Sequence, residues 1–506
     1  MVILDQKGAT YLDNPKFFQS DNPQVLALAV KRAITKDKGA EHKKKMRQGV
    51  DYYRFKHDIL NYRLFYIDNE GKVKEETNRS NIKIAHPYLT ELVDQKVQYL
   101  LAKPLEVKTE QKGLQDYLKE YLDEDFQMML QEVIEGASQK GHEFVFVKYD
   151  DRITFKPADS LKVIEIYNSD GQLVAVINYY EAEILIDEKM TRVMRAELWD
   201  KEKVWYFITK DAHGQTLEVD NTVPVNPIYH DTYLDEESKE AIGQSLGRII
   251  SVDDFIPFIR FDNNKYRTTD LEPIKDAIDD YDLMACSLSN NLQDFDQPFF
   301  AVKGFNGTDY DALINNVRSR GVVGTKIDGG LDVHTVQIPV EARKEKLRID
   351  KEAIYKFGQG FDSSQVGDGN VTNIVIQSRY TSLDLKANKT EIRLRRLVRQ
   401  LLELIIADIN KRFGKDYDTS DLEIIVSRSM LVNDEEKATS ENSRATAKQT
   451  LVNALAVAAA YLPSETITEE VCKLWDIDFE EVKKKMEEED FGVLEGDEDE
   501  VEPVAT

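Results

Sequence analysis

Cysteine is nearly absent from this sequence, which has only Cys286 and Cys472 among 506 residues. So few cysteines exclude a disulfide scaffold and a cysteine zinc site. Long hydrophobic runs are also missing, because stretches such as Ala454–Leu462 fall well short of the ~20 residues that span a bilayer. The first residues, Met1–Lys7, carry charges where a signal peptide is apolar. We therefore expect a soluble protein made in a reducing compartment.

Basic residues are in clear deficit. The chain has 67 Lys and Arg against 93 Asp and Glu, a formal net charge of −26. Such acidity argues against a protein that coats nucleic acid by neutralising its phosphates, but it permits one that lets DNA pass without sticking. Hydrophobic residues make up 41% of the chain, enough for a sizeable core, and the length suggests about three domains.

The first half of the chain predicts helices followed by antiparallel strands. A helical pattern runs from Asn22 to about Lys45, and its basic cluster, Lys43–Arg47, is interpreted as a solvated face. Further helices are predicted after Pro87 and over Leu114–Ala137. Beyond Gly141 come short apolar runs, with Asn168–Gly171 as a hairpin turn. The fold class is therefore α+β.

The middle of the chain predicts a pair of oppositely charged helices. From Asp270 onward, apolar positions recur at alternating steps of three and four residues, which indicates a narrow seam facing other helices. Carboxylates occupy many of the other positions of this helix, and a solvent- or channel-facing surface is their favoured interpretation. A second helix, Val340–Phe357, is rich in Lys and Arg, so we expect antiparallel neighbours attracted by charge. The seam residues are Leu271, Ile274, Ile278, Tyr281, Ala285, Leu288 and Leu292.

A glycine-rich loop and a very long helix follow. Gly358–Gly369 holds four glycines in twelve residues, which indicates a flexible loop. Asn370–Phe413 contains neither Pro nor Gly, so one helix about 60 Å long is predicted. The C-terminal region reads as helical over Glu435–Tyr461 and Thr468–Glu489 and ends in an acidic, solvated tail.

Signs of catalytic chemistry are weak. Gly243–Gly247 matches the nucleophile elbow around Ser245, but an acidic polar run precedes it and only His334 lies downstream, so a simple loop is favoured. No phosphate-binding loop occurs, and the seven histidines form no close ligand pairs. We therefore expect no ATPase site, no metal, no cofactor and no enzymatic activity.

The order of these parts resembles the portal proteins of tailed bacteriophages, specifically the SPP1-type family of siphoviruses that infect Gram-positive hosts. Each shared piece is a weak motif, but their common order extends over nearly the whole chain. The pieces are Leu92–Leu100 with Pro104, Pro257-Phe258 with Asn263-Asn264, Asp270-Leu271 with Ile278–Asp282, Asp328–Asp332, Ile338–Val340, Leu383–Asn388 and Asn433-Asp434.

The resemblance implies a portal fold in a ring of about twelve identical subunits around a DNA channel. Residues 1–262 would be the wing, 263–295 the first stem helix, 296–339 a small α/β clip and 340–357 the second stem helix. Residues 358–372 would be the tunnel loop, 373–432 a long helix and a wing strand, 433–490 the helical crown and 491–506 a disordered acidic tail.

The resemblance also implies site residues. The tunnel loop would narrow the channel through Gly358, Gly360, Asp362, Ser363, Ser364, Gln365, Val366, Gly367, Asp368, Gly369 and Asn370. The clip, which meets the packaging motor and later the head–tail adaptor, includes Phe299, Phe300, Lys303, Asp328, Gly329 and Gly330.

The function implied is that of a ring at one capsid vertex, through which double-stranded DNA is packaged and later ejected. Its partners would be copies of itself, the terminase large subunit, the head–tail adaptor, and the major capsid and scaffolding proteins, with no membrane involved. It would reside in the virion, and in the host cytoplasm during assembly. Two alternatives stay open: another acidic virion assembly protein, such as a scaffold or adaptor, and a hydrolase based on Ser245.

Overall fold

The structure is a computed structural model of mixed α+β class. It describes residues 3–4, 10–11, 17–18, 20–77, 79–149, 152–186, 189–209, 216–223, 225–229, 255–294, 299–303, 330–334, 338–362, 373–428, 434–458, 461, 463–475, 479 and 482. The chain divides into two compact units, one of Met1–Gln365 with Arg379–Met430 and one of Val366–Ser378 with Leu431–Thr506. The nucleophile-elbow candidate around Ser245 lies outside the described residues.

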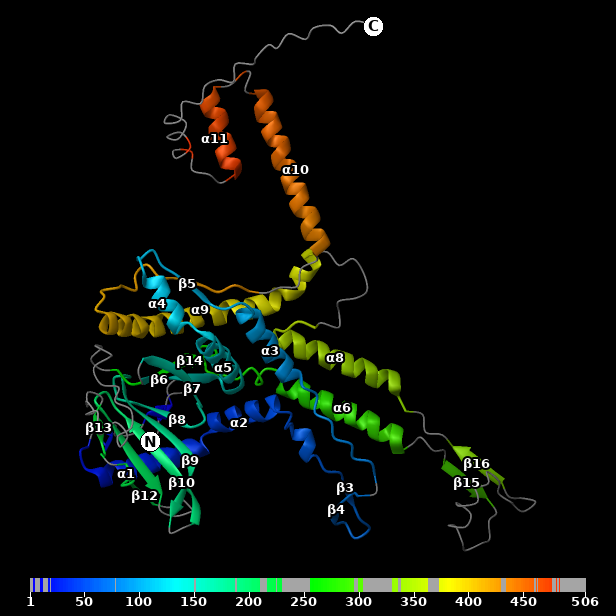
Figure 1. Ribbon diagram of the computed structural model, residues 1–506. Helices are drawn as coiled ribbons and strands as arrows, with labels where there is room; N and C mark the ends of the chain where they lie inside the picture. The colour runs from blue at the N-terminus through cyan, green and yellow to red at the C-terminus, as the bar shows by residue number, and fades with distance from the viewer. Residues whose placement is uncertain are drawn as a thin grey trace. The chain divides into compact units, whose positions relative to one another are not determined.

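An antiparallel sheet forms the first core of the larger unit (Figure 1). Its order is β12-β11-β10-β9-β8, with β13 pairing to β11. Apolar side chains of helix α1, Pro23–Gly39, pack on one face of this sheet, among them Leu26, Val30 and Ile34. The strands are β8 Val163–Tyr167, β9 Leu173–Ile186, β10 Lys189–Trp199, β11 Lys203–Thr209, β12 Leu217–Val219 and β13 Ile228–Tyr229. The hairpin predicted at Asn168–Gly171 is confirmed as the β8–β9 turn.

A second sheet, in the order β14-β6-β7, forms a layer with helices α2, α3 and α5. Its strands are β6 His142–Tyr149, β7 Ile153–Ala158 and β14 Phe258–Asp262. The helices are α2 Glu41–Tyr53, α3 Tyr88–Leu101, α4 Leu114–Tyr121 and α5 Glu124–Lys140. Smaller elements are β1 Ile3–Leu4, β2 Thr10–Tyr11, the 3-10 turn η2 Asp58–Asn61, β3 Phe65–Ile67, β4 Val73–Glu75, β5 Glu106–Lys108 and β17 Glu423–Ile425.

Two predicted helices are divided. The pattern over Leu114–Ala137 forms α4 and α5, because the Asp123 side chain accepts a hydrogen bond from the Phe126 backbone N–H and caps a new helix. The N-terminal pattern is broken at Ala40, which is extended, so the basic cluster begins α2. Lys43 of that cluster is only 2% exposed and pairs with Asp37 at 3.2 Å, so the solvated interpretation is wrong for this residue.

The two charged helices are present as α6, Lys275–Asp294, and α8, Val340–Gly358, which lie side by side (Figure 1). Strands β15, Phe299–Lys303, and β16, Gly330–His334, pair between them in sequence. Helix α6 begins later than the periodicity suggests, because Pro273 and a run of turns occupy 263–274.

The predicted long helix is confirmed as α9, Asn373–Phe413, with 41 residues. Leu394, Val398 and Leu401 lie on its buried apolar face. In the second unit, α10, Asp434–Ala458, and α11, Ser464–Trp475, pack against each other. Among the helices that the structure describes, none is both long and apolar enough to cross a membrane.

Candidate functional site: the α6–α8 pair and its anchor

Helices α6 and α8 pack antiparallel through an apolar strip and opposite charges. Lys346 of α8 forms ion pairs with Asp280 of α6 and with Asp350, and the hydrogen bond to Asp280 is the largest cause of its raised pKa. Ile278 and Ile354 are fully buried. The predicted pairing of the two helices is therefore confirmed, but of the ion pairs described for α8 only Lys346–Asp280 reaches α6.

An extended segment, residues 80–86, runs along α6 and covers one of its faces. Every second backbone N–H of the segment donates to every fourth side chain of the helix. Two extended residues advance about 6.6 Å and four helical residues about 6.0 Å, so the two repeats stay in register. The bonds are Ser80 N to Asp294 Oδ1 (3.1 Å), Ile82 N to Asn290 Oδ1 (2.7 Å), Ile84 N to Cys286 Sγ (3.2 Å) and His86 N to Asp282 Oδ1 (3.1 Å).

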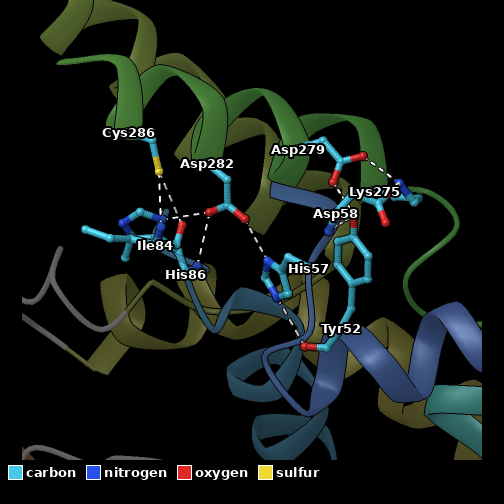
Figure 2. A network of polar contacts seen from close by, with 9 residues as sticks. All are labelled: Tyr52, His57, Asp58, Ile84, His86, Lys275, Asp279, Asp282 and Cys286. Carbon is cyan, nitrogen blue, oxygen red and sulfur yellow. Dashed lines mark hydrogen bonds and ion pairs between the residues drawn. The ribbon is translucent and has the colours of Figure 1, made fainter. Parts of the chain in front are cut away.

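Asp282 is the centre of a buried polar network on that covered face (Figure 2). Its carboxylate oxygens lie 2.6 Å from His57 Nδ1 and 2.7 Å from His86 Nδ1. Burial opposes the charged carboxylate, but the hydrogen bonds from His57 and His86 outweigh it and lower the pKa of Asp282. The interpretation of the α6 carboxylates as solvent- or channel-facing is therefore wrong for Asp282, which is 0% exposed.

His57 links this network to α2. Its Nε2 lies 3.1 Å from the backbone oxygen of Tyr52, and its ring stacks on the Tyr52 ring with centroids 4.4 Å apart. Both ring nitrogens of His57 thus lie within hydrogen-bond distance of an oxygen, one on α6 and one on α2. Lys275 adds ion pairs to Asp58 and Asp279, both at 2.6 Å, so the start of α6 is tied to the segment after α2 (Figure 2).

A second buried cluster anchors the base of the pair. Asp270 lies 3.2 Å from Lys96 Nζ of α3 and 3.1 Å from Lys386 Nζ of α9. It also accepts a hydrogen bond from Asn263 Nδ2 at 2.9 Å. Burial disfavours the charged carboxylate, but the attraction of the Lys386 and Lys96 ammonium groups is stronger. It holds the pKa of Asp270 well below its ordinary value. Lys386 also donates to the Gly358 carbonyl at 3.0 Å, so one lysine joins α9 to the turn before α6 and to the end of α8.

The predicted seam residues differ in burial along the chain. Leu271, Ile274 and Ile278 are buried within the subunit, while Leu292 is 50% exposed. Tyr281, Ala285 and Leu288 are half-buried. The covered face instead continues through Asp282 and Cys286, so an apolar period of three and four did not identify the whole buried side.

The first residues of the proposed tunnel loop are fixed by packing. Gly358 ends α8, and a Cβ at Gly358 or Gly360 would overlap Leu92 of α3. Phe361 stacks on Tyr380 with ring centroids 4.4 Å apart, and its backbone N–H donates to Gln95 Oε1 at 2.9 Å. These two glycines therefore permit close packing rather than flexibility. Asp362 pairs with Lys351 at 3.1 Å. Ser363, Ser364, Gln365, Val366, Gly367, Asp368, Gly369 and Asn370 lie outside the described residues.

The proposed clip is described only as a hairpin. Phe299, Phe300 and Lys303 lie on β15, and Lys303 pairs in register with Gly330 of β16. Asp328 and Gly329 fall outside the described residues. In the part of the chain that the structure describes, no group of three or more His, Cys, Asp or Glu could hold a metal ion.

Sequence reasoning missed Lys96, His57 and His86 as members of these networks. Lys96 occupies a helical position between Leu92 and Leu100 on the apolar side of α3, a signal that this lysine is buried and paired. The two histidines gave no such signal, because their partner is more than 190 residues away in the chain.

Comparison with known proteins decides the family. The family described as "Phage portal protein, SPP1 Gp6-like" matches residues 33–457. The chain belongs to this family of phage portal proteins. The portal protein of Bacillus phage SPP1 is 29% identical over 397 residues, which are 77% of this chain and 75% of that protein. The portal protein of Clostridium phage phiCD119 is 24% identical over 428 residues, 79% of this chain and 86% of that one.

A solved structure, titled as the neck of a native GTA particle computed with C12 symmetry, is 12% identical. It covers 76% of this chain and 89% of its own chain with a TM-score of 0.34, a likeness too distant to support an argument. Family membership is enough to establish that this portal protein is a structural, non-enzymatic component of the phage virion. The Ser245 hydrolase and the scaffold or adaptor hypotheses are therefore set aside.

Proposed function

We propose that this portal protein assembles into a closed ring of about twelve identical subunits around a channel for double-stranded DNA, with α6 and α8 as its stem. The observation that carries the proposal is the construction of the helix pair. Its two helices bury Ile278 and Ile354 and share the half-exposed Lys346–Asp280 ion pair, and the buried Asp270 cluster ties the pair to α3 and α9. Such a rigid, anchored arm suits a wall that must hold its shape while DNA slides past.

The charges of the pair support a passage that does not grip DNA. Many of its cations are already neutralised within the subunit: Lys346 by Asp280 and Asp350, and Arg348 by Glu345 and Glu352. The whole chain carries a formal net charge of −26. Acidic walls repel phosphates at short range, so the duplex stays central and friction is low.

The remaining parts are proposed from the resemblance to the family. We propose the wing at 1–262 together with the long helix and strand of 373–432, the clip at 296–339, the crown at 433–490 and the acidic tail at 491–506. We propose that the channel constriction lies within 363–372, and the packing of residues 358–362 against α3 and α9 supports this narrower range. This segment contains Asp368 and the polar residues Ser363, Ser364 and Gln365 but no Lys or Arg. It therefore has no cation with which to bind phosphates.

We further propose that the clip meets the terminase large subunit during packaging and the head–tail adaptor afterwards. The wing then faces the major capsid and scaffolding proteins. The ring forms in the host cytoplasm and ends at one vertex of the capsid, where it conducts DNA inward and later outward. ATP hydrolysis belongs to the terminase, which is consistent with the lack of a phosphate-binding loop motif in this sequence.

Negative-stain electron microscopy of the purified full-length protein tests the ring. The expected particles are rings with a stain-filled central hole. Particles of single-subunit mass at all concentrations, or discs without a hole, would contradict the proposal.

A further inference from the structure

One side of α9 carries four cations that have no carboxylate partner among the described residues. Lys389, Arg396 and Arg399 are exposed, and Arg393 is half-buried. Positions 389, 393 and 396 follow the helical spacing of one face. Ile392 lies among them and is 71% exposed. Together with Ile392, three of these cations, Lys389, Arg393 and Arg396, line one wall of an open cleft of about 1060 Å³, whose opposite wall is built by residues 255–266. We call Lys389, Ile392, Arg393 and Arg396 the basic stripe.

Helix α5 carries the reverse arrangement. Glu124, Asp125 and Glu132 are exposed and have no ion pair within the described part of the chain. Met128 lies between them and is 54% exposed. With Asp125 and Glu132 it lines a groove of about 410 Å³ that shares no residue with the cleft on α9. We call Glu124, Asp125, Met128 and Glu132 the acidic stripe.

The two stripes match in length and pattern. From its first to its last residue the basic stripe covers seven helical steps and the acidic stripe eight, about 10 and 12 Å at ~1.5 Å per step. Each has its exposed apolar residue near the middle and its charges on both sides. Two cations line the acidic groove. Arg152 is held by Asp123 at 2.9 Å, and Lys156 forms no ion pair with the three carboxylates of the stripe, which remain available.

We propose that the basic stripe of one subunit docks on the acidic stripe of the next, with Ile392 against Met128. This inference rests on the ring of the proposed function and names one of its subunit contacts. Two different, complementary patches on one chain make a head-to-tail contact, which closes into a ring when the rotation is right. Unpaired opposite charges around a shared apolar centre favour this partner.

Charge reversal with mixing tests the contact. One variant carries Arg393→Glu and Arg396→Glu, so both of its stripes are acidic. The other carries Glu124→Arg and Glu132→Arg, so both are basic. A control with the same change of charge as the first variant, Arg32→Glu and Lys36→Glu, alters exposed cations of α1. Sedimentation velocity measures the ring fraction at equal protein concentration, and far-UV circular dichroism checks that each variant is folded.

The control should form rings like the unmodified chain. For each reversed variant alone, the fraction of protein in rings should fall at least tenfold. Mixing the two reversed variants should restore rings of alternating composition, which also shows that both are folded. Rings from either variant alone, or no rescue on mixing, would overturn the contact while leaving the ring intact. A basic-stripe variant that forms normal rings but binds a DNA duplex more weakly in fluorescence anisotropy would make the stripe a nucleic-acid surface instead. Absence of rings from the unmodified chain would contradict the proposed function itself.

Discussion

Replacing Asp270 with asparagine tests whether the buried cluster anchors the α6–α8 pair. The substitution keeps the shape of the side chain but removes the carboxylate that faces Lys96 at 3.2 Å and Lys386 at 3.1 Å. Lys96 is 1% exposed, so its ammonium is left in the interior without a counter-charge. Removing one partner of a buried ion pair costs about 3–5 kcal/mol. Lys344→Ala is the matched control, because its pair with Glu341 is exposed and contributes at most about 1 kcal/mol.

Lys96 gives the effect a characteristic pH dependence. Burial lowers the pKa of Lys96 to about 8 even with Asp270 beside it. Without the carboxylate the folded-state pKa falls further, while the unfolded value stays near ~10.4. Consider the pH range between the lowered Lys96 pKa of the variant and about 8. In this range Lys96 is protonated in the unfolded variant but not in the folded one, so the free energy of unfolding of the variant rises by about 1.4 kcal/mol per pH unit. The original chain gains nothing until pH passes its own Lys96 pKa, so the difference should narrow from pH 6 to pH 8.

Urea unfolding followed by tryptophan emission measures this difference. The chain has three tryptophans, of which Trp199 and Trp205 lie in the sheet of the larger unit. A Trp475→Phe background removes the third, on α11, and two protein concentrations separate subunit stability from assembly. A loss below 1 kcal/mol, or a loss that stays constant from pH 6 to pH 8, would refute the reasoning.

Four further predictions concern assembly and passage. Ile278→Asp places an unpaired charge at a fully buried position, so the variant should sediment as single subunits. If the variant sediments with the mass of the ring, Ile278 has no role in the stem seam. Raising the salt concentration should increase hydrogen exchange together in 275–294 and 340–358, because the Lys346–Asp280 ion pair joins α6 to α8; salt-insensitive exchange would mean that apolar packing suffices. Gly367→Pro should leave rings and empty procapsids intact but block packaging, measured as nuclease-protected DNA, since proline fixes φ near ~−65°. Asp368→Lys should slow packaging, most at low salt, by gripping phosphates, and normal rates in both variants would remove the constriction from 363–372.

The sequence predicted best the elements whose pattern is long and uninterrupted. The 41 residues of α9 lack Pro and Gly, and the opposite charges of α6 and α8 anticipated their ion pair. Shorter breaks were missed, because a single capping aspartate, Asp123, outweighs a continuous apolar period.

The polar networks could be predicted only in part. Asp270, Lys96 and Lys386 all lie in the motifs that carry the family resemblance, but their convergence depends on three elements far apart in sequence. Asp282 looks like one more carboxylate of an acidic helix, since nothing local shows that residues 80–86 cover it. Gly358 was taken for flexibility, whereas its lack of a side chain allows Leu92 to approach.

Electron cryomicroscopy of DNA-filled capsids tests the central claim most directly. A map of the portal vertex should show a closed ring in which α6 and α8 of every subunit surround a rod of axial DNA density, with the segment 363–372 nearest to the duplex. A ring whose α6–α8 pairs point away from the axis, or a vertex without a through-going channel, would contradict the account.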